Sequence, residues 1–155
     1  MTVCRSCELI ARRDAGEAPS WDCIHRTEYW DLVHKFDTTL PGWLVLVLRR
    51  HIVAIDEMTA LEAGELGVLM RQASIALREV VLCAKTYVIQ FAEHAEHPHV
   101  HFHVIPRMDD MPADRRGVNV FGYDPSSDQE AISESARNDI AVRIKPYINP
   151  GDEIG

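Results

Sequence analysis

The chain has 155 residues, about the size of one ordinary domain, and 46% of them are hydrophobic while 26% are charged. This balance is typical of a soluble globular protein and argues against a disordered or membrane protein. The net charge of −8 argues against a general binder of nucleic-acid backbones, which needs a basic surface, but allows a nucleotide in a small pocket.

The first residues, MTVCRSCELI, lack the apolar run of a signal peptide, and no segment approaches the roughly 20 apolar residues of a membrane span. We therefore expect a cytoplasmic protein without a membrane partner. Its cysteines are expected to be thiols or metal ligands before disulfides. Cys4 and Cys7 have the C-x-x-C spacing of a zinc-binding pair, although two unpaired thiols on a loose N-terminus stay an alternative. Cys23 and Cys83 are expected to be small buried hydrophobes.

Three segments predict strands. YWDLVHKF, residues 29–36, is rich in β-branched and aromatic residues, and so is TYVIQFA, which begins at Thr86. The apolar run WLVLVL, residues 43–48, follows a Pro-Gly pair and ends at charged residues. This pattern predicts a strand that is buried on both faces and opens onto solvent at its end.

A helix is expected between the second and third of these segments. Thr59 and Glu62 have the spacing of a capping box, in which a hydroxyl and a carboxylate satisfy free amides at a helix start. Gly64 and Gly67 should cost this helix roughly 1 kcal/mol each relative to Ala. Apolar residues continue at three- and four-residue spacing, which predicts a stripe that faces the core: Leu66, Leu69, Met70, Ala73, Leu77 and Val80.

The stretch HPHVHFHVIPR, residues 97–107, holds four histidines in seven positions. Alternate side chains of a strand point the same way, so His99, His101 and His103 are expected to share one face, and Pro106 to end the strand. A neutral imidazole can attack phosphorus, and neighbouring imidazolium groups can donate hydrogen bonds to the charge on its oxygens. A solvated strand or a metal site stays an alternative, since it is the common explanation of a single H-x-H pair.

The last fifty residues predict a loop and one more helix. Residues 108–127 are rich in Pro, Gly and Asp, and we expect a long loop that covers a site. Ser127 and Glu130 repeat the capping-box spacing before an amphipathic helix that should reach about Pro146. We find no internal repeat or interdomain linker, so residues 1–155 are expected to form a single domain.

At HVHFHVI, residues 99–105, the chain resembles the histidine triad (HIT) nucleotide hydrolases and transferases, whose signature alternates His and apolar residues in this way. The resemblance extends more loosely over residues 4–107, through CELIARRDAGEAPSW and PGWLVLVLRRHI, and does not cover residues 108–155. It implies an α+β fold with an antiparallel sheet of about five strands and two main helices, often in a homodimer. It also implies nucleotide hydrolysis or nucleotidyl transfer without an organic cofactor, on a phosphoramidate, a dinucleoside polyphosphate or a similar substrate.

The resemblance assigns roles to the histidine row. By this match His101 is the nucleophile, which attacks the α-phosphate and forms a nucleotidyl-histidine intermediate that water or another acceptor resolves. His99 would orient it through its backbone carbonyl, and His103 would contact the phosphate. Some relatives also bind zinc through the histidine after the central strand and the first histidine of the triad. Those positions are His51 and His99, which with the C-x-x-C pair would complete a structural Cys2His2 site for zinc: Cys4, Cys7, His51 and His99.

The chain departs from the family at Trp43, where many relatives have a fourth histidine. Tryptophan has one donor and no acceptor, so it cannot shuttle a proton. A nucleotide-binding module with weak or no turnover is therefore the alternative function. A metalloenzyme that holds a catalytic metal in the histidine row is a third hypothesis.

Further substrate contacts are expected near the row. Asp37 is the nearest candidate for the acidic residue that holds the ribose in relatives, although it could equally be a turn former. FAEHAEHP, residues 91–98, lacks the Gly of relatives and offers His94 and His97, which are loop residues or substrate contacts. Arg107 adds a positive charge beside the row and could attract an anionic substrate.

Overall fold

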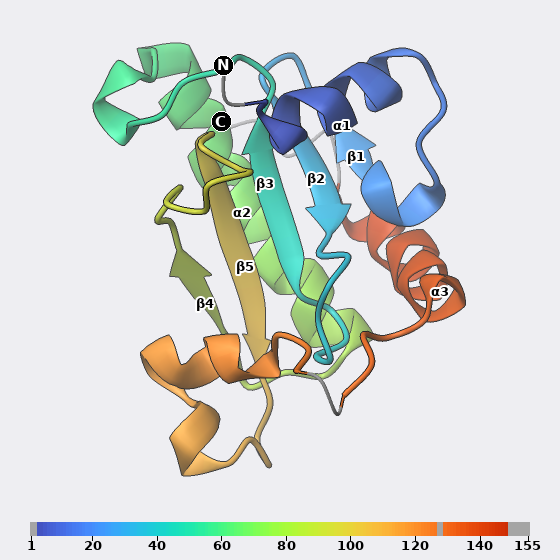
Figure 1. Ribbon diagram of the computed structural model, residues 1–155. Coiled ribbons are helices and arrows are strands. Elements are labelled where there is room, and N and C mark those ends of the chain that lie inside the picture. Colours follow the sequence, from blue (N-terminus) through green and yellow to red (C-terminus); the bar gives the residue numbers. More distant parts are fainter. Residues whose placement is uncertain (1–2, 127–128, 149–155) are drawn as a thin grey trace.

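The computed structural model describes residues 3–126 and 129–148. Within these residues the chain forms an antiparallel sheet of five strands in the order β1-β2-β3-β5-β4 (Figure 1). The strands are β1 (His25–Arg26), β2 (Trp30–His34), β3 (Leu44–Leu48), β4 (Lys85–Ile89) and β5 (His101–Arg107). The expected α+β class and the antiparallel sheet of about five strands are therefore confirmed.

The long helix α2 (Ala60–Val80) covers one face of the sheet (Figure 1). The expected capping box is confirmed, because the Glu62 N–H donates to the Thr59 hydroxyl at 3.2 Å and the Thr59 N–H donates to the Glu62 carboxylate at 2.8 Å. Its apolar stripe packs on alternate residues of the central strands and forms the main core with them. None of the helices in the described ranges is long and apolar enough to cross a membrane.

A second helix, α1 (Arg5–Asp14), lies over the opposite face of the sheet and adds to the two helices expected (Figure 1). Its Ile10 belongs to a smaller apolar cluster that includes Val33, Val45 and Ile105 from the strands. Arg13, near the end of α1, is buried between two carboxylates: it contacts Asp22 at 2.8 Å and Asp31 at 3.3 Å. Charged groups thus anchor this end of α1 to the sheet.

The C-terminal part differs from the expectation in its helix start. Ser127 lies outside the described residues, and Glu130 is not helical. Helix α3 (Glu134–Ile144) begins later, because the Ser133 hydroxyl caps it by accepting the Ala136 N–H at 3.1 Å. The segment expected to be a loop contains two short 3-10 helices, η3 (Ala113–Arg115) and η4 (Gly117–Tyr123).

Strand β5 also has different bounds from those expected. It begins at His101, after His99, and it continues through Pro106 to Arg107. Pro106 lies beyond the last pair of β3 with β5, Leu44 with Val104, so β5 there has a neighbour on the β4 side alone. A proline is tolerated at such an edge position because fewer ladder hydrogen bonds depend on its missing N–H.

Candidate functional site

A cavity of about 530 Å³ lies on the face of the sheet that α2 does not cover. Its floor is formed by β2, β3 and β5, and its walls by α1 and by the segments that follow β2 and β4. Phe121 and Asp124, from the segment after β5, also line the cavity. Residues 108–127, which were expected to cover a site, therefore contribute to this cavity. The volume is in the range of small-molecule sites.

His101 presents a free nitrogen in this cavity. Its Nδ1 lies 2.7 Å from the His99 carbonyl oxygen, which can only accept, so Nδ1 carries the proton and Nε2 keeps its lone pair. Burial lowers the pKa of His101, and the charges of His94 and Lys35 lower it further. The side chain is therefore neutral at pH 7 and suited to nucleophilic attack through Nε2.

His103 has the opposite proton arrangement. The Nε1–H of Trp43 donates to its Nδ1 at 2.9 Å, so the proton of a neutral His103 is on Nε2. Burial, followed by the charges of His101 and Lys35, lowers the pKa of His103 to about 3. Trp43 is fully buried and packs edge to face on His103, which lines the cavity. Trp43 therefore acts on this site from behind His103.

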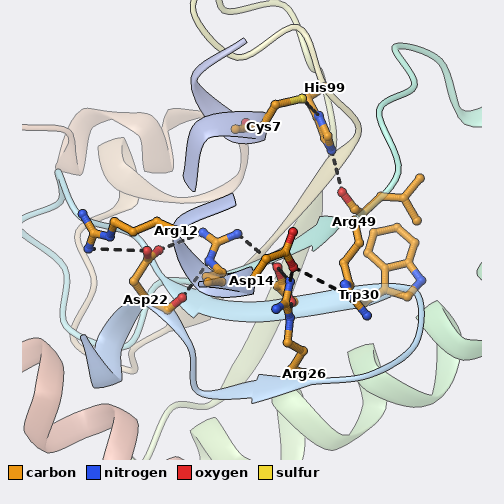
Figure 2. A network of polar contacts seen from close by, with 12 residues as sticks. Cys7, Arg12, Asp14, Asp22, Arg26, Trp30, Arg49 and His99 are labelled. Carbon is orange, nitrogen blue, oxygen red and sulfur yellow. Dashed lines mark hydrogen bonds and ion pairs between the residues drawn. The ribbon is translucent and has the colours of Figure 1, made fainter. Parts of the chain in front are cut away.

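His99 does not join the other two histidines in the cavity. It precedes β5, so the alternation of a strand does not apply to it, and its side chain lies beside Cys7 (Figure 2). Its Nδ1 is 3.6 Å from the sulfurs of Cys4 and Cys7 and 3.1 Å from His51 Nδ1, while its Nε2 is 2.5 Å from the Leu48 carbonyl oxygen.

The structure thus brings together the four residues expected to form a metal site. One ligand atom from each of Cys4, Cys7, His51 and His99 lies within 4.8 Å of the others, so these residues could hold a metal ion. Burial and the neighbouring Cys4 raise the pKa of the Cys7 thiol to about 11. Two thiols and two imidazoles are the donor set of a closed tetrahedral zinc site, and the Leu48 carbonyl would orient the His99 ring from behind.

The other expected contacts fall in different places. Asp37, His94 and His97 line the cavity, but Arg107 is not among its lining residues. Arg107 pairs with Lys85 at the far end of β5, and its guanidinium lies 3.6 Å from Asp109.

Lys35, which follows β2, supplies a positive charge that the sequence did not single out. Its ammonium bonds the Asp124 carboxylate at 2.8 Å, pairs with Asp37 and lies 5.2 Å from the Trp43 ring centroid. Lys35 lines the cavity together with its chain neighbours His34 and Phe36, so no alternation along the chain distinguishes it. Its partner Asp124 lies 89 positions away, so no local sequence signal could have identified it.

Neither a family model nor a curated protein sequence matches the chain. Several solved structures are similar to it. A Zn-bound histidine triad family protein from Mycobacterium smegmatis is 15% identical, with a TM-score of 0.66 over 94% of this chain and 92% of that one. A histidine triad protein from Bradyrhizobium japonicum is 23% identical, with a TM-score of 0.66 over 82% of this chain and 90% of that one.

The diadenosine triphosphate hydrolase of Plasmodium falciparum is 18% identical, with a TM-score of 0.61 over 81% of this chain and 75% of that one. At such identities the likeness shows the fold. Residues 99–105, which carry the sequence resemblance, supply the nitrogen and the carbonyl of the arrangement at His101. The chain therefore has the α+β fold of the histidine triad proteins.

Proposed function

We propose that the chain is a histidine triad nucleotide hydrolase or nucleotidyl transferase that acts at the α-phosphate of its substrate. The hydrogen bond between His101 Nδ1 and the His99 carbonyl carries this proposal, because it leaves Nε2 of His101 unprotonated in a cavity of suitable size. The resemblance at residues 99–105 and the likeness to a diadenosine triphosphate hydrolase support it.

The reaction would proceed in two displacements. The Nε2 lone pair of His101 attacks the α-phosphorus, and the bond from phosphorus to the leaving group breaks with its electron pair on the leaving group. The proton on Nδ1 stays in place, and its bond to the His99 carbonyl stabilises the positive charge on the ring. Water or another acceptor then attacks the phosphorus, the P–N electron pair returns to Nε2, and the acceptor's proton leaves to solvent.

We also propose that Cys4, Cys7, His51 and His99 bind a structural zinc ion. The proposal is supported by the donor set, because two sulfurs and two imidazole nitrogens that lie within 4.8 Å of one another are the ligands of a closed tetrahedral zinc site. A zinc ion would tie the start of α1 to the residues before β5 and so keep the His99 carbonyl beside His101. We also propose a cytoplasmic location, and a homodimer, which the resemblance implies.

The mass of the intact protein after brief incubation with a diadenosine polyphosphate or adenosine 5′-phosphoramidate tests the nucleophile. The quench must be alkaline, because the phosphorus–nitrogen bond of phosphohistidine is labile in acid. We expect a nucleotidyl adduct on the native chain and on a His25→Asn control, which changes a histidine of β1 outside the cavity wall. His101→Gly should show none. An adduct that persists in His101→Gly would exclude His101 as the nucleophile.

The second candidate is a nucleotide-binding module with weak turnover, and Trp43 at the position of the fourth histidine favours it. A nucleotide that binds tightly and stays intact, without an adduct, would identify this case. The metalloenzyme hypothesis has less support, because the His99 ring faces the two cysteines instead of joining His101 and His103 in the cavity.

A further inference from the structure

Fixed donors determine where the protons of the cavity histidines are. Trp43 is a donor only, so the Nδ1 of His103 that it contacts is an acceptor, and the His103 proton is on Nε2. The backbone N–H of Glu96 donates to His94 Nδ1 at 3.2 Å, which places the proton of a neutral His94 on Nε2 as well. His101 has the reverse arrangement. The cavity thus presents one lone pair for attack, on His101, with the Nε2–H groups of His103 and His94 as donors.

This arrangement limits the supply of protons to a leaving group. A second proton on His103 would have to sit on Nδ1, where the Trp43 N–H already points, so the cationic form would lose that hydrogen bond. The low pKa of His103 agrees with this constraint. A neutral imidazole N–H can hydrogen-bond to a phosphate oxygen but gives up its proton poorly. An amine leaving group needs such a proton as its bond to phosphorus breaks, whereas a phosphate leaving group departs as an oxyanion.

The Lys35 ammonium group can supply the positive charge that stabilises a departing phosphate oxyanion. The ammonium lies 5.2 Å from the Trp43 ring centroid, and Lys35 lines the same cavity as His101 and His103. The ion pairs with Asp37 and Asp124 compete with a substrate, but these carboxylates are 48% and 43% exposed, so each pair contributes little to stability and an anionic substrate can displace it. A fixed cation aimed at developing negative charge is an effective source of transition-state stabilisation.

We propose that Trp43 and Lys35 restrict the site to leaving groups that depart as anions, so that nucleoside polyphosphates are cleaved in preference to phosphoramidates. Trp43 is a positioning residue that keeps His103 neutral, and Lys35 binds the departing phosphate. The bond from the α-phosphorus to the bridging oxygen breaks, its electron pair stays on the departing phosphate, and no proton is required at that step. The inference rests on the proposed function, since it names the substrate class of the same cavity.

Turnover of two adenosine substrates tests the preference. For the native protein we expect kcat/KM for diadenosine triphosphate to exceed that for adenosine 5′-phosphoramidate by at least about tenfold. Lys35→Met keeps an apolar stem over Trp43 and removes the charge, so it should lower kcat/KM for the polyphosphate by about a hundredfold and for the phosphoramidate much less. Lys35→Arg should restore most of the loss. Lys85→Met, an exposed residue of the edge strand β4, is the matched control.

Trp43→Phe tests the other half of the proposal, because it keeps an aromatic ring and removes the donor. Relative to the polyphosphate, cleavage of the phosphoramidate should rise. Long-range proton–nitrogen NMR of the native protein should show the His103 proton on Nε2, a readout that requires no variant. Comparable cleavage of the two substrates by the native chain would overturn the proposal, since an acid such as His97 would then protonate the amine. A His103 proton found on Nδ1 would overturn it too.

Binding separates this inference from the proposed reaction. If neither substrate is turned over, the proposed function fails, and the affinities for α,β-methylene-ADP and AMP still test Lys35. Lys35→Met should weaken binding of the methylene analogue at least about tenfold and leave AMP nearly unchanged, because AMP has no second phosphate. Equal losses for the two nucleotides would remove Lys35 from the leaving-group position.

Discussion

The two helices that cover the two faces of the sheet are attached to it in different ways. Helix α2 lies on an apolar stripe, in which Leu66, Leu69, Ala73 and Leu77 are buried in the main core. Helix α1 contributes Ile10 to the smaller apolar cluster, and polar groups hold both of its ends. Hydrophobic contact tolerates small shifts, whereas ion pairs and metal ligands require one geometry. The helix beside the cavity is therefore the one held by directional contacts.

The two ends of α1 differ in the kind of polar group that contacts them. At its last residues, Arg13 meets the carboxylates of Asp22 and Asp31, and Arg26 pairs with Asp31 as well at 2.7 Å, so two cations compensate the two buried carboxylates. Figure 2 shows Arg12 and Asp22 at this end and Cys7 beside His99 at the other. At the cysteine end, thiols and imidazoles lie close enough together to hold a metal ion. The carboxylate end therefore has its counter-charges within the chain, whereas the proposed zinc ion would supply the charge at the cysteine end.

Breaking the ion-pair end should have the largest effect. Arg13→Met leaves two buried carboxylates without their shared partner, and the expected loss in the free energy of unfolding is about 3–5 kcal/mol. The neighbouring Arg12→Met is the matched control, because Arg12 is 40% exposed and lies 3.7 Å from Asp22. It should cost less than about 1 kcal/mol. Urea unfolding measures both, and similar losses for the two variants would contradict the ion-pair account.

Removing a metal should weaken the other end. Zinc at about a hundred times its Kd would contribute about 2.7 kcal/mol to folding, so a chelator should lower the Tm by roughly 5–10 °C. Cys7→Ser should have the lower Tm at the start and should not respond to chelator or to added zinc. Elemental analysis of the purified protein provides the independent readout. A protein without zinc, whose Tm ignores chelator, would show that α1 needs no ion.

The contrast between the helices explains what could be predicted from the sequence. Apolar runs and the Thr59 capping box depend on neighbours in the chain, and they predicted β3 and α2. The Cys2His2 set was expected from the resemblance, because its spacing belongs to the family pattern. Arg13 and Lys35 belong to no pattern, since their partners Asp31 and Asp124 lie 18 and 89 positions away in the chain. Only the fold brings such pairs together.

His34 is a buried polar side chain whose two ring nitrogens contact backbone groups, in contrast to the ion pairs and the metal-ligand set at the ends of α1. The Gly42 N–H donates to its Nε2 at 2.9 Å, its Nδ1 lies 2.8 Å from the Lys35 carbonyl oxygen, and burial lowers its pKa to about 4. In the unfolded chain the His34 imidazole takes up a proton near pH 6.5. The neutral, buried form therefore adds its full contribution to the free energy of unfolding above that pH, and this contribution is lost as the pH falls towards 4. At pH 5 the loss should be about 2 kcal/mol.

Urea unfolding of the native chain and of His34→Gln at pH 7 and pH 5 isolates this contribution. Glutamine can keep one acceptor and one donor but does not titrate in this range. The native chain should therefore lose about 2 kcal/mol more than the variant between the two pH values. Equal losses would show that His34 does not hold a lowered pKa. In that case only the ion pairs of α1 and the apolar contacts of α2 would remain as distinct ways of holding elements to the sheet.

The smallest effect should come from the apolar helix. Gly67 lies on the exposed side of α2, and an added Cβ would meet nothing within 4 Å, so Gly67→Ala should stabilise the fold by about 1 kcal/mol through helix propensity. Gly42→Ala is the opposite case, because Gly42 has φ +91° and a Cβ there would lie 3.1 Å from Val81. It should destabilise the fold. Unchanged substrate binding in Gly67→Ala would show that α2 can be altered without disturbing the cavity, whereas a change would mean that the two faces of the sheet are coupled.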